Sequence, residues 1–449
     1  MMDLWTKANT ALQHTNPVTA RGEVTDITGL IIEANGPAVG LGVTCSIVQG
    51  DRKVAAQVVG FRKGRILLMP LGELHGIAPG ASIYSHSTAE TIKVSEDLLG
   101  RVIDPLGNPV DGKGSICPGI DVALFRKPPS PLERKRITQI CDVGIKAVNT
   151  VLTIGKGQRV AIMSGSGVGK STFLGMIAKH ARTSVNVIGL VGERGREVRE
   201  FIERDLGPEG LARSVIVVAT SDTSALMRIR AAFVATAIAE FFRDRGEDVT
   251  LMVDSITRFC MAQREVGLAI GEPPSASGYT PSVFAMLPRL LERAGTTGGA
   301  GAITGFYTVL VEGDDMNEPI ADAVRSILDG HIVLSRALAA RGQYPAVDIL
   351  QSISRLMSEL VDEETLQRAA DARRVVADYN EVEDLVTIGA YKPGQNAKAD
   401  FAVQKIEGVR QFLMQRPDEK FSITESEDLL CQVFSDAPEH KPVMRRAAV

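Results

Sequence analysis

"SGSGVGKST", residues 164–172, is the stretch of sequence that decides the fold. It differs at one position from the phosphate-binding pattern G-x-x-x-x-G-K-[ST], because Ser164 stands where the pattern has its first glycine. The apolar run "QRVAIM" precedes the stretch, and the helix-like run "STFLGMIAKHA" overlaps its end. Backbone N–H groups at the start of a helix point at a bound anion. This strand–loop–helix order therefore predicts a phosphate-binding loop rather than a chance cluster of glycines.

The residue types within the loop fit that chemistry. Its glycines let the backbone come close to phosphate oxygens. Lys170 is expected to neutralise the β- and γ-phosphates of a nucleoside triphosphate, and Ser171 to offer its hydroxyl to Mg²⁺. A small residue such as Ser164 suits the first position, because the loop leaves the strand there. The predicted nucleotide contacts are Gly165, Ser166, Gly167, Val168, Gly169, Lys170, Ser171 and Thr172.

An aspartate at the end of another buried strand adds to the pattern. The run "VTLMVD", residues 249–254, ends in Asp254. In open α/β sheets, ligands bind at the carboxyl edge of the strands. A carboxylate at that edge can orient the hydrated Mg²⁺ of a bound nucleoside triphosphate, so Asp254 is a candidate metal ligand.

The segment "VGERGREV", residues 191–198, follows a third apolar run. A carboxylate beside the γ-phosphate can polarise an attacking water, and Glu193 is the candidate for that role. Arg194 could touch the γ-phosphate, and Glu197 could hold a Mg²⁺-bound water. Taken alone, such a cluster is more often a solvated, ion-paired start of a helix.

The patterns around these motifs predict an α/β protein with several domains. Short β-type runs between residues 21 and 94 predict a small barrel or sandwich. From residue 141 to about 360, apolar runs alternate with helical segments, which predicts a mostly parallel sheet covered by helices on both faces. After residue 364, apolar residues recur at three- and four-residue spacing, as in a helical domain. The expected boundaries are 1–20, 21–95, 96–364 and 365–449.

The composition narrows the classes of function and location. The net charge of −4 and the pI near 6.0 argue against a nucleic-acid binder. The five cysteines are scattered, which predicts reduced thiols in a cytoplasmic protein. No run of about 18 apolar residues occurs in the sequence. We expect a cytoplasmic protein that is still able to dock on a membrane complex.

The first 20 residues carry a further hypothesis. Leu4, Trp5, Ala8, Ala11 and Leu12 lie at helical spacing. Such a segment is either an amphipathic helix that docks on a stator-like regulator or a membrane surface, or a disordered tail.

Several long stretches together resemble a known family, the ATPases of type III protein export, which are similar to the catalytic subunit of rotary ATP synthases. The stretches are "GSGVGKST", "VGERGREV", "TLMVDSITRFCMAQREVGLAIGEPPSASGYTPSVFAMLPRLLERAG", "VEGDDMNEPIADAVRSILDGHIVLSR" and "YPAVDILQSISR". The resemblance covers nearly the whole chain, with "GRVIDPLGNPVDG" upstream and "DLVTIGAYKPG" downstream. Within the family, "VEGDDMNEPIAD" is most like the flagellum-specific export ATPases.

The resemblance implies a RecA-like P-loop core with an N-terminal β-barrel and a helical C-terminal domain. It implies a homohexameric ring with ATP and Mg²⁺ at the subunit interfaces. Lys170, Glu193 and Arg194 fall at catalytic positions. Arg355 falls at the arginine-finger position, supplied by the neighbouring subunit, and Tyr344 falls where the synthase subunit stacks an aromatic ring on adenine. The implied partners are a stator-like regulator, export substrates with their chaperones, and export gate proteins of the inner membrane, but no nucleic acid.

Other functions fit parts of the pattern. A non-hydrolysing subunit of a larger ring would lack the catalytic glutamate, whereas Glu193 is present. An RNA translocase would need stacking aromatics in the N-domain, which offers only Phe61 and Tyr84 between residues 21 and 94. An injectisome ATPase and, less favoured, a rotary ATP synthase subunit remain the alternatives.

Overall fold

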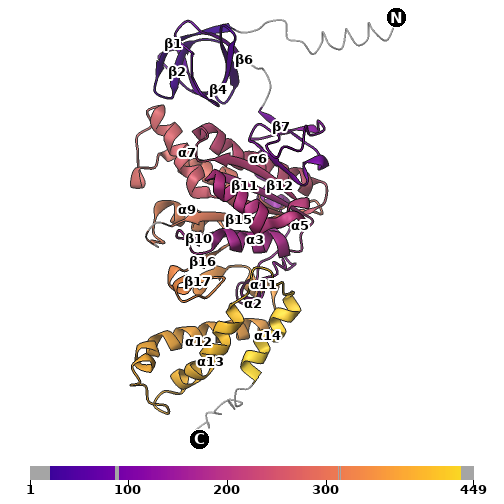
Figure 1. Cartoon of the computed structure of the whole chain (residues 1–449), viewed down its shortest axis with the longest axis vertical. Coiled ribbons are helices and arrows are strands. Elements are labelled where there is room, and N and C mark those ends of the chain that lie inside the picture. Colours follow the sequence, from indigo (N-terminus) through magenta and orange to yellow (C-terminus); the bar gives the residue numbers. More distant parts are fainter. Residues whose placement is uncertain (1–20, 86–89, 312, 314, 436–449) are drawn as a thin grey trace, which may run out of the picture.

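The computed structural model describes residues 21–85, 90–311, 313 and 315–435. The chain runs from a β-barrel through a mixed α/β body to a helical domain at the opposite end of the long axis (Figure 1). The segment 1–20, for which a docking helix is one hypothesis, lies outside the described residues. The domain boundaries at residues 95 and 364 stay predictions.

The N-terminal strands close into a barrel in the order β1-β2-β5-β4-β3-β6. Their alternating side chains fill its interior, as Val24, Ile32 and Ile83 show with at most 1 % exposure. Pairing of β1 with β6 joins the first and last strands, so the barrel has no free edge. The strands are β1 (Arg21–Thr28), β2 (Ile31–Asn35), β3 (Thr44–Gln49), β4 (Arg52–Arg62), β5 (Arg65–Pro70) and β6 (Ser82–Ser85).

A second small sheet lies between the barrel and the α/β body. Its strands β7 (Thr91–Val94) and β9 (Ile120–Ala123) pair antiparallel. Ile92 and Val122 bury their side chains in the core of the α/β body. This segment therefore packs with the body that follows it.

The central sheet has the order β17-β16-β10-β15-β13-β11-β12-β8. Its neighbours pair in parallel, except that β17 runs antiparallel to β16. Strands β10, β13 and β11 therefore end on the same edge of the sheet, which is where Lys170, Glu193 and Asp254 lie. The strands are β8 (Arg101–Ile103), β10 (Arg159–Ser164), β11 (Val185–Glu193), β12 (Ser214–Thr220), β13 (Asp248–Asp254), β15 (Ala302–Leu310), β16 (Gly330–Leu334) and β17 (Val347–Ser354), with the short β14 (Gly295–Thr296) beside β15.

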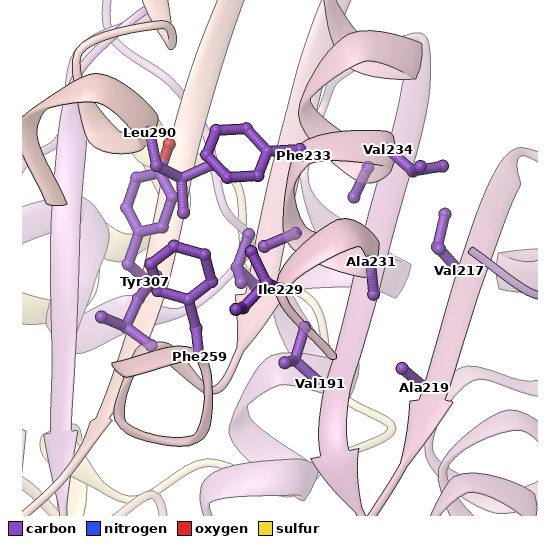
Figure 2. Close-up of a cluster of buried hydrophobic side chains, with 14 of the residues drawn as sticks. Val191, Val217, Ala219, Ile229, Ala231, Phe233, Val234, Phe259, Leu290 and Tyr307 are labelled. Atoms are coloured by element: carbon purple, nitrogen blue, oxygen red, sulfur yellow. The ribbon is translucent and has the colours of Figure 1, made fainter. Parts of the chain in front are cut away.

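Helices cover both faces of this sheet, as the continuous apolar strands predict. Side chains of β11 alternate between two cores: Val187 and Val191 join one, whereas Ile188 and Leu190 join the other. Figure 2 shows the first core, where Val191, Val217 and Ala219 of the sheet lie beneath the helix that carries Phe233.

The helices that form these layers include α3, which coincides with the predicted helical run "STFLGMIAKHA" to within one residue. In the α/β body they are α2 (Lys146–Val151), α3 (Lys170–His180), α4 (Gly195–Glu200), a π-helical turn (Phe201–Leu206), α5 (Gly207–Ala212), α6 (Ala225–Asp244), α7 (Ile256–Ala269), α8 (Pro281–Leu291), α9 (Pro319–Ile327), α10 (Arg336–Ala340) and α11 (Met357–Leu360). Short 3₁₀ turns cover Glu96–Leu98, Pro131–Glu133 and Ala276–Gly278.

The C-terminal region is helical, as the spacing of its apolar residues predicts. Side-chain caps start α12 and α13, where Asp362 accepts the N–H of Thr365 and Asn396 accepts that of Lys398. The buried residues of these helices join the core beneath α3. The helices are α12 (Glu363–Thr387), α13 (Ala397–Leu413) and α14 (Ile423–Ser435). Among the described residues, none of the helices combines the length and apolar character that a membrane crossing requires.

All five cysteines lie within the described ranges, and each has a free thiol. Burial raises the pKa of the Cys45 thiol to about 11, so this group stays protonated at neutral pH. Cys45, Cys141 and Cys260 are buried, whereas Cys117 is exposed.

Candidate nucleotide-binding site

The glycine-rich loop connects β10 to α3 directly. Ser164 is the last residue of the strand, and Lys170 is the first residue of the helix. Gly167 and Gly169 have φ angles of +80° and +88°, a region that side chains other than glycine rarely adopt. These residues and the edges of neighbouring strands line a cleft of about 720 Å³. The loop therefore presents the start of α3 to a space large enough for a nucleotide.

Ser164 itself belongs to the end of the strand. Its side chain is buried, with 2 % of the residue exposed, and its backbone carbonyl accepts the N–H of Val311 at 3.0 Å. Its hydroxyl has no hydrogen-bond partner among the described residues. A small side chain fits here, as the sequence suggests, because the position lies before the turn that needs glycine.

Lys170 lies between two carboxylates at the floor of the cleft. Its Nζ atom is 3.3 Å from Oε1 of Glu193 and also pairs with Oδ1 of Asp254. Thr308, on β15, donates its hydroxyl to Asp254 Oδ1 at 2.6 Å. One helix and two strands thus bring together the lysine and the two acids that the sequence separates widely, and a third strand supplies Thr308.

Burial and charge shift the pKa values of this group. Burial, and next the negative charge of Asp254, raise the pKa of Glu193 to about 7, against the opposing effect of Lys170. Burial opposes the charge on Lys170, but the adjacent carboxylates outweigh it and raise the lysine pKa. Lys170 is therefore a stable cation, whereas Glu193 can gain or lose a proton near neutral pH.

Arg194 and Glu197 lie at the rim of the same cleft. They form an ion pair of 3.4 Å, and the Arg194 side chain is 81 % exposed. This is the solvated helix start that the sequence also allowed. The backbone before them bends at Gly192, where a methyl group would lie only 2.8 Å from Cβ of Arg258. Arg194 and Glu197 thus line the cleft with side chains that are exposed to solvent.

Several cleft residues were not found from the sequence. Arg204, Arg258 and Arg336 line the cleft, and Thr308 holds Asp254. Arg258 lies in the first turn of α7, four residues after Asp254. Its closeness to Asp254 in the sequence was the one signal that could have assigned it to the cleft. The other three come from segments whose patterns are ordinary for a helix or a buried strand.

Tyr344 lies beside the loop. A methyl group built at Gly169 would lie 3.5 Å from Cε1 of the Tyr344 ring, so the ring is in van der Waals reach of the loop. The residue is 47 % exposed. The stacking role of Tyr344 stays a prediction.

Arg355 does not reach the cleft of its own chain. Its N–H donates to Asp329, whose carboxylate binds Arg159 at the first residue of β10. Lys170 follows the other end of that strand, which is roughly 17 Å long at about 3.3 Å per residue. The guanidinium of Arg355 instead donates to the backbone of Arg325 at 3.0 Å. Any action of Arg355 on a nucleotide therefore requires a second subunit.

A phosphate-binding loop at the carboxyl edge of a parallel sheet, with a lysine and two carboxylates beneath it, defines a P-loop nucleotide-binding domain of the RecA-like class. Residues 144–354 match the nucleotide-binding domain of the ATP synthase alpha/beta family, residues 24–86 match its β-barrel domain, and residues 361–432 match the C-terminal domain of the T3SS EscN ATPase. The chain belongs to the flagellar and type III export ATPases, which are related to the ATP synthase subunits. The predicted fold class is confirmed.

Individual relatives agree with this assignment. The flagellum-specific ATP synthase of Bacillus subtilis (strain 168) is 54 % identical over 409 residues, which span 90 % of this chain and 93 % of the relative. A type 3 secretion system ATPase of Xanthomonas euvesicatoria is 49 % identical over 418 residues, 93 % of this chain and 94 % of the relative. The assembled ATPase EscN of enteropathogenic Escherichia coli superposes with a TM-score of 0.88 at 42 % identity, covering 92 % of this chain and 99 % of EscN.

Proposed function

We propose that this chain hydrolyses Mg²⁺-bound ATP as one subunit of a homohexameric ring that energises flagellar type III protein export. The observation that carries the proposal is the group of Lys170, Glu193 and Asp254 at the phosphate-binding loop. The similarity to EscN, solved as an assembled ATPase, supports the ring. We place the ring at the cytoplasmic side of the export apparatus, in line with the family.

The phosphate-binding loop and Lys170 are proposed to bind the phosphates of ATP. The N–H groups at the start of α3 face the cleft, and the positive end of the helix dipole adds to the attraction for phosphate. Lys170 pairs with two carboxylates in this structure, and we expect it to turn to the phosphates when ATP enters. A charge-assisted contact of this kind contributes about 1.5–3 kcal/mol.

The residues present also fit a magnesium ion. Oxygen donors are the ligands that Mg²⁺ prefers, and the Ser171 hydroxyl and the Asp254 carboxylate lie at this end of the cleft, with Glu197 at its rim. When bound, the ion supplies positive charge that offsets the charge of the phosphates. Thr308 keeps Asp254 oriented through its 2.6 Å hydrogen bond.

Glu193 is proposed as the general base. Its ionised carboxylate would accept a proton from the water that attacks the γ-phosphate. A base with a pKa of about 7 suits this task near neutral pH, because it is partly ionised and still basic enough to accept the proton. Arg194, at the rim, is proposed to contact the γ-phosphate.

Arg355 of the neighbouring subunit is proposed to complete the site. A cationic finger stabilises charge on the transferring phosphoryl group and contributes about 10³–10⁵ in rate in such enzymes. The distance between Arg355 and Lys170 within one chain agrees with this arrangement. Tyr344, beside Gly169, is proposed to stack on the adenine.

The flagellar system is favoured over the injectisome. The stretch "VEGDDMNEPIAD" is flagellar in type, and flagellum-specific relatives include the one at 54 % identity. An injectisome ATPase is the second candidate, because the Xanthomonas euvesicatoria relative is 49 % identical. EscN has been solved with its central stalk EscO, and we propose a similar stalk partner here. A stator-like regulator, export substrates with their chaperones, and export gate proteins are the further proposed partners.

The ring and its activity can be tested together. ATPase activity per subunit is measured over a range of protein concentrations while mass photometry records particle sizes. We expect activity to rise steeply as hexamers form. Full activity in particles of one subunit would overturn the proposal.

A further inference from the structure

The loop that carries Tyr344 is held by the C-terminal helical domain. This loop joins α10 to β17, and its Tyr344 carbonyl accepts the N–H of Gln415 at 2.9 Å. Gln415 lies two residues after the end of α13. A residue of the C-terminal domain thus bonds directly to the residue whose ring lies against Gly169.

The side chain of Gln415 is anchored on three sides. Its Oε1 accepts the N–H of Lys146 at 2.9 Å, and its Nε2 donates to the carbonyls of Gly144 at 2.8 Å and Glu419 at 2.9 Å. The residue is 5 % exposed, so these bonds face little competition from water. An amide has two donors and one acceptor group, and here all are used. The position of Gln415 is therefore set by the segment that leads into α2.

The surroundings fix this segment further. The Lys146 ammonium lies 4.8 Å from the centre of the Phe421 ring, and the Phe421 N–H donates to the Gly144 carbonyl at 3.3 Å. His180, the last residue of α3, contacts the Pro417 carbonyl at 3.0 Å. The turn between α13 and α14 thus lies against the far end of the phosphate-loop helix.

A second contact holds the start of the Tyr344 loop. Arg341 binds Glu383 of α12 with two hydrogen bonds of 2.9 and 3.1 Å. Arg410 of α13 binds the same carboxylate at 3.0 Å. The loop is therefore held on both sides of Gly342 by C-terminal helices.

We propose that Gln415 is a positioning residue. It connects the C-terminal domain to the Tyr344 loop and so places the Tyr344 ring at the adenine end of the nucleotide site. This inference rests on the proposed stacking of Tyr344 on adenine. The affinity for ATP then has two contributions. The contact with the phosphates depends on Lys170, and the contact with the adenine base depends on the C-terminal domain.

The test compares ATP with inorganic tripolyphosphate, which has the phosphates and no base. Equilibrium binding of both ligands is measured on the full chain for wild type, Gln415→Met and Tyr344→Ala. Gln411→Met, at an exposed glutamine of α13, is the matched control. We expect Gln415→Met to weaken ATP binding at least about fivefold, the lower end of what one base–aromatic stack contributes. Tripolyphosphate binding should stay within about twofold, inside the ordinary effect of a substitution that touches no ligand.

The double variant separates positioning from general stability. Combined with Tyr344→Ala, Gln415→Met should add little further loss, because both changes remove the same stack. Equal weakening of both ligands by Gln415→Met would overturn the inference, and so would unchanged ATP binding while Tyr344→Ala weakens it. If Tyr344→Ala itself leaves the ratio of the two affinities unchanged, the proposed base contact is wrong and the inference with it. Should Gln415→Met not fold, Glu383→Gln tests the second contact and must shift the same ratio.

Discussion

Replacing Lys170 by methionine tests the electrostatics of the site apart from catalysis. The change removes the cation that pairs with Glu193 and Asp254, whose side chains are 15 % and 5 % exposed. Two nearly buried carboxylates then share a site without a cationic partner. Removing one member of a buried ion pair lowers the free energy of unfolding by about 3–5 kcal/mol. Because Glu193 keeps some exposure, we expect a loss of about 3 kcal/mol. For a domain of this size, that loss lowers the melting temperature by about 6–12 °C.

The loss should depend on pH in one direction. In the wild type the pKa of Glu193 is about 7, above its ordinary value of 4.5. Without Lys170 this pKa rises further, because nothing offsets the charge of Asp254. A carboxyl group whose pKa is raised on folding loses stability as the pH rises above its unfolded value. The deficit of Lys170→Met should therefore be smallest below about pH 7, where Glu193 is protonated in both proteins, and should grow as the pH rises above 7.

Thermal unfolding without nucleotide at pH 5, 6, 7 and 8 measures this dependence. Lys398→Met is the control, because Lys398 also lies in the first turn of a helix but is exposed. Its melting temperature should follow the wild type at every pH. A deficit of Lys170→Met that stays constant from pH 5 to 8 would refute the coupling between the lysine and the carboxylates.

Three further predictions concern the same residues and the core. Glu193→Gln should keep ATP affinity within a few-fold but lower kcat by about 10²–10⁴, and undiminished turnover in a steady-state ATPase assay would assign the base elsewhere. In the wild type, kcat/KM should fall as the pH drops through about 7, because this ratio reports the free enzyme, in which Glu193 then takes up a proton. A flat profile between pH 6 and 8 would contradict this role. Glu240→Gln should cost about 3–5 kcal/mol in urea unfolding, because it leaves the fully buried Arg293 guanidinium without its ion pair at 2.7 Å.

Much of the candidate site could be predicted from the sequence because its parts follow strong local patterns. Lys170 belongs to a glycine-rich loop with a strand before it and a helix after it. Glu193 and Asp254 each end a continuous apolar run. Parallel strands bring such ends to one edge, so the three residues could be expected together without knowing the strand order.

Other parts depend on pairing that local patterns do not carry. Thr308 lies within an apolar strand, where threonine is ordinary, and only the pairing of β13 with β15 brings it to Asp254. Closure of the barrel between β1 and β6 is likewise a long-range pairing, so the sequence left barrel and sandwich both open.

Arg355 and Tyr344 could be named only through the resemblance to a family. An arginine after a strand and a tyrosine before a proline have no local signal for a nucleotide. The structure places Tyr344 beside Gly169, and it leaves Arg355 at the opposite end of β10 from the loop. Gln415 was not predicted at all, because its role rests on hydrogen bonds to segments distant in sequence.

The central claim is that each site joins Lys170 and Glu193 of one subunit to Arg355 of the next. Mixed rings test it most directly. Arg355→Ala and Glu193→Gln proteins are each expected to be nearly inactive. Random mixing in equal amounts places an intact Glu193 opposite an intact Arg355 at about a quarter of the interfaces, so the mixture should regain up to about that share of wild-type activity. A mixture that shows subunit exchange by energy transfer between fluorescent labels, yet stays as inactive as its components, would contradict the shared site.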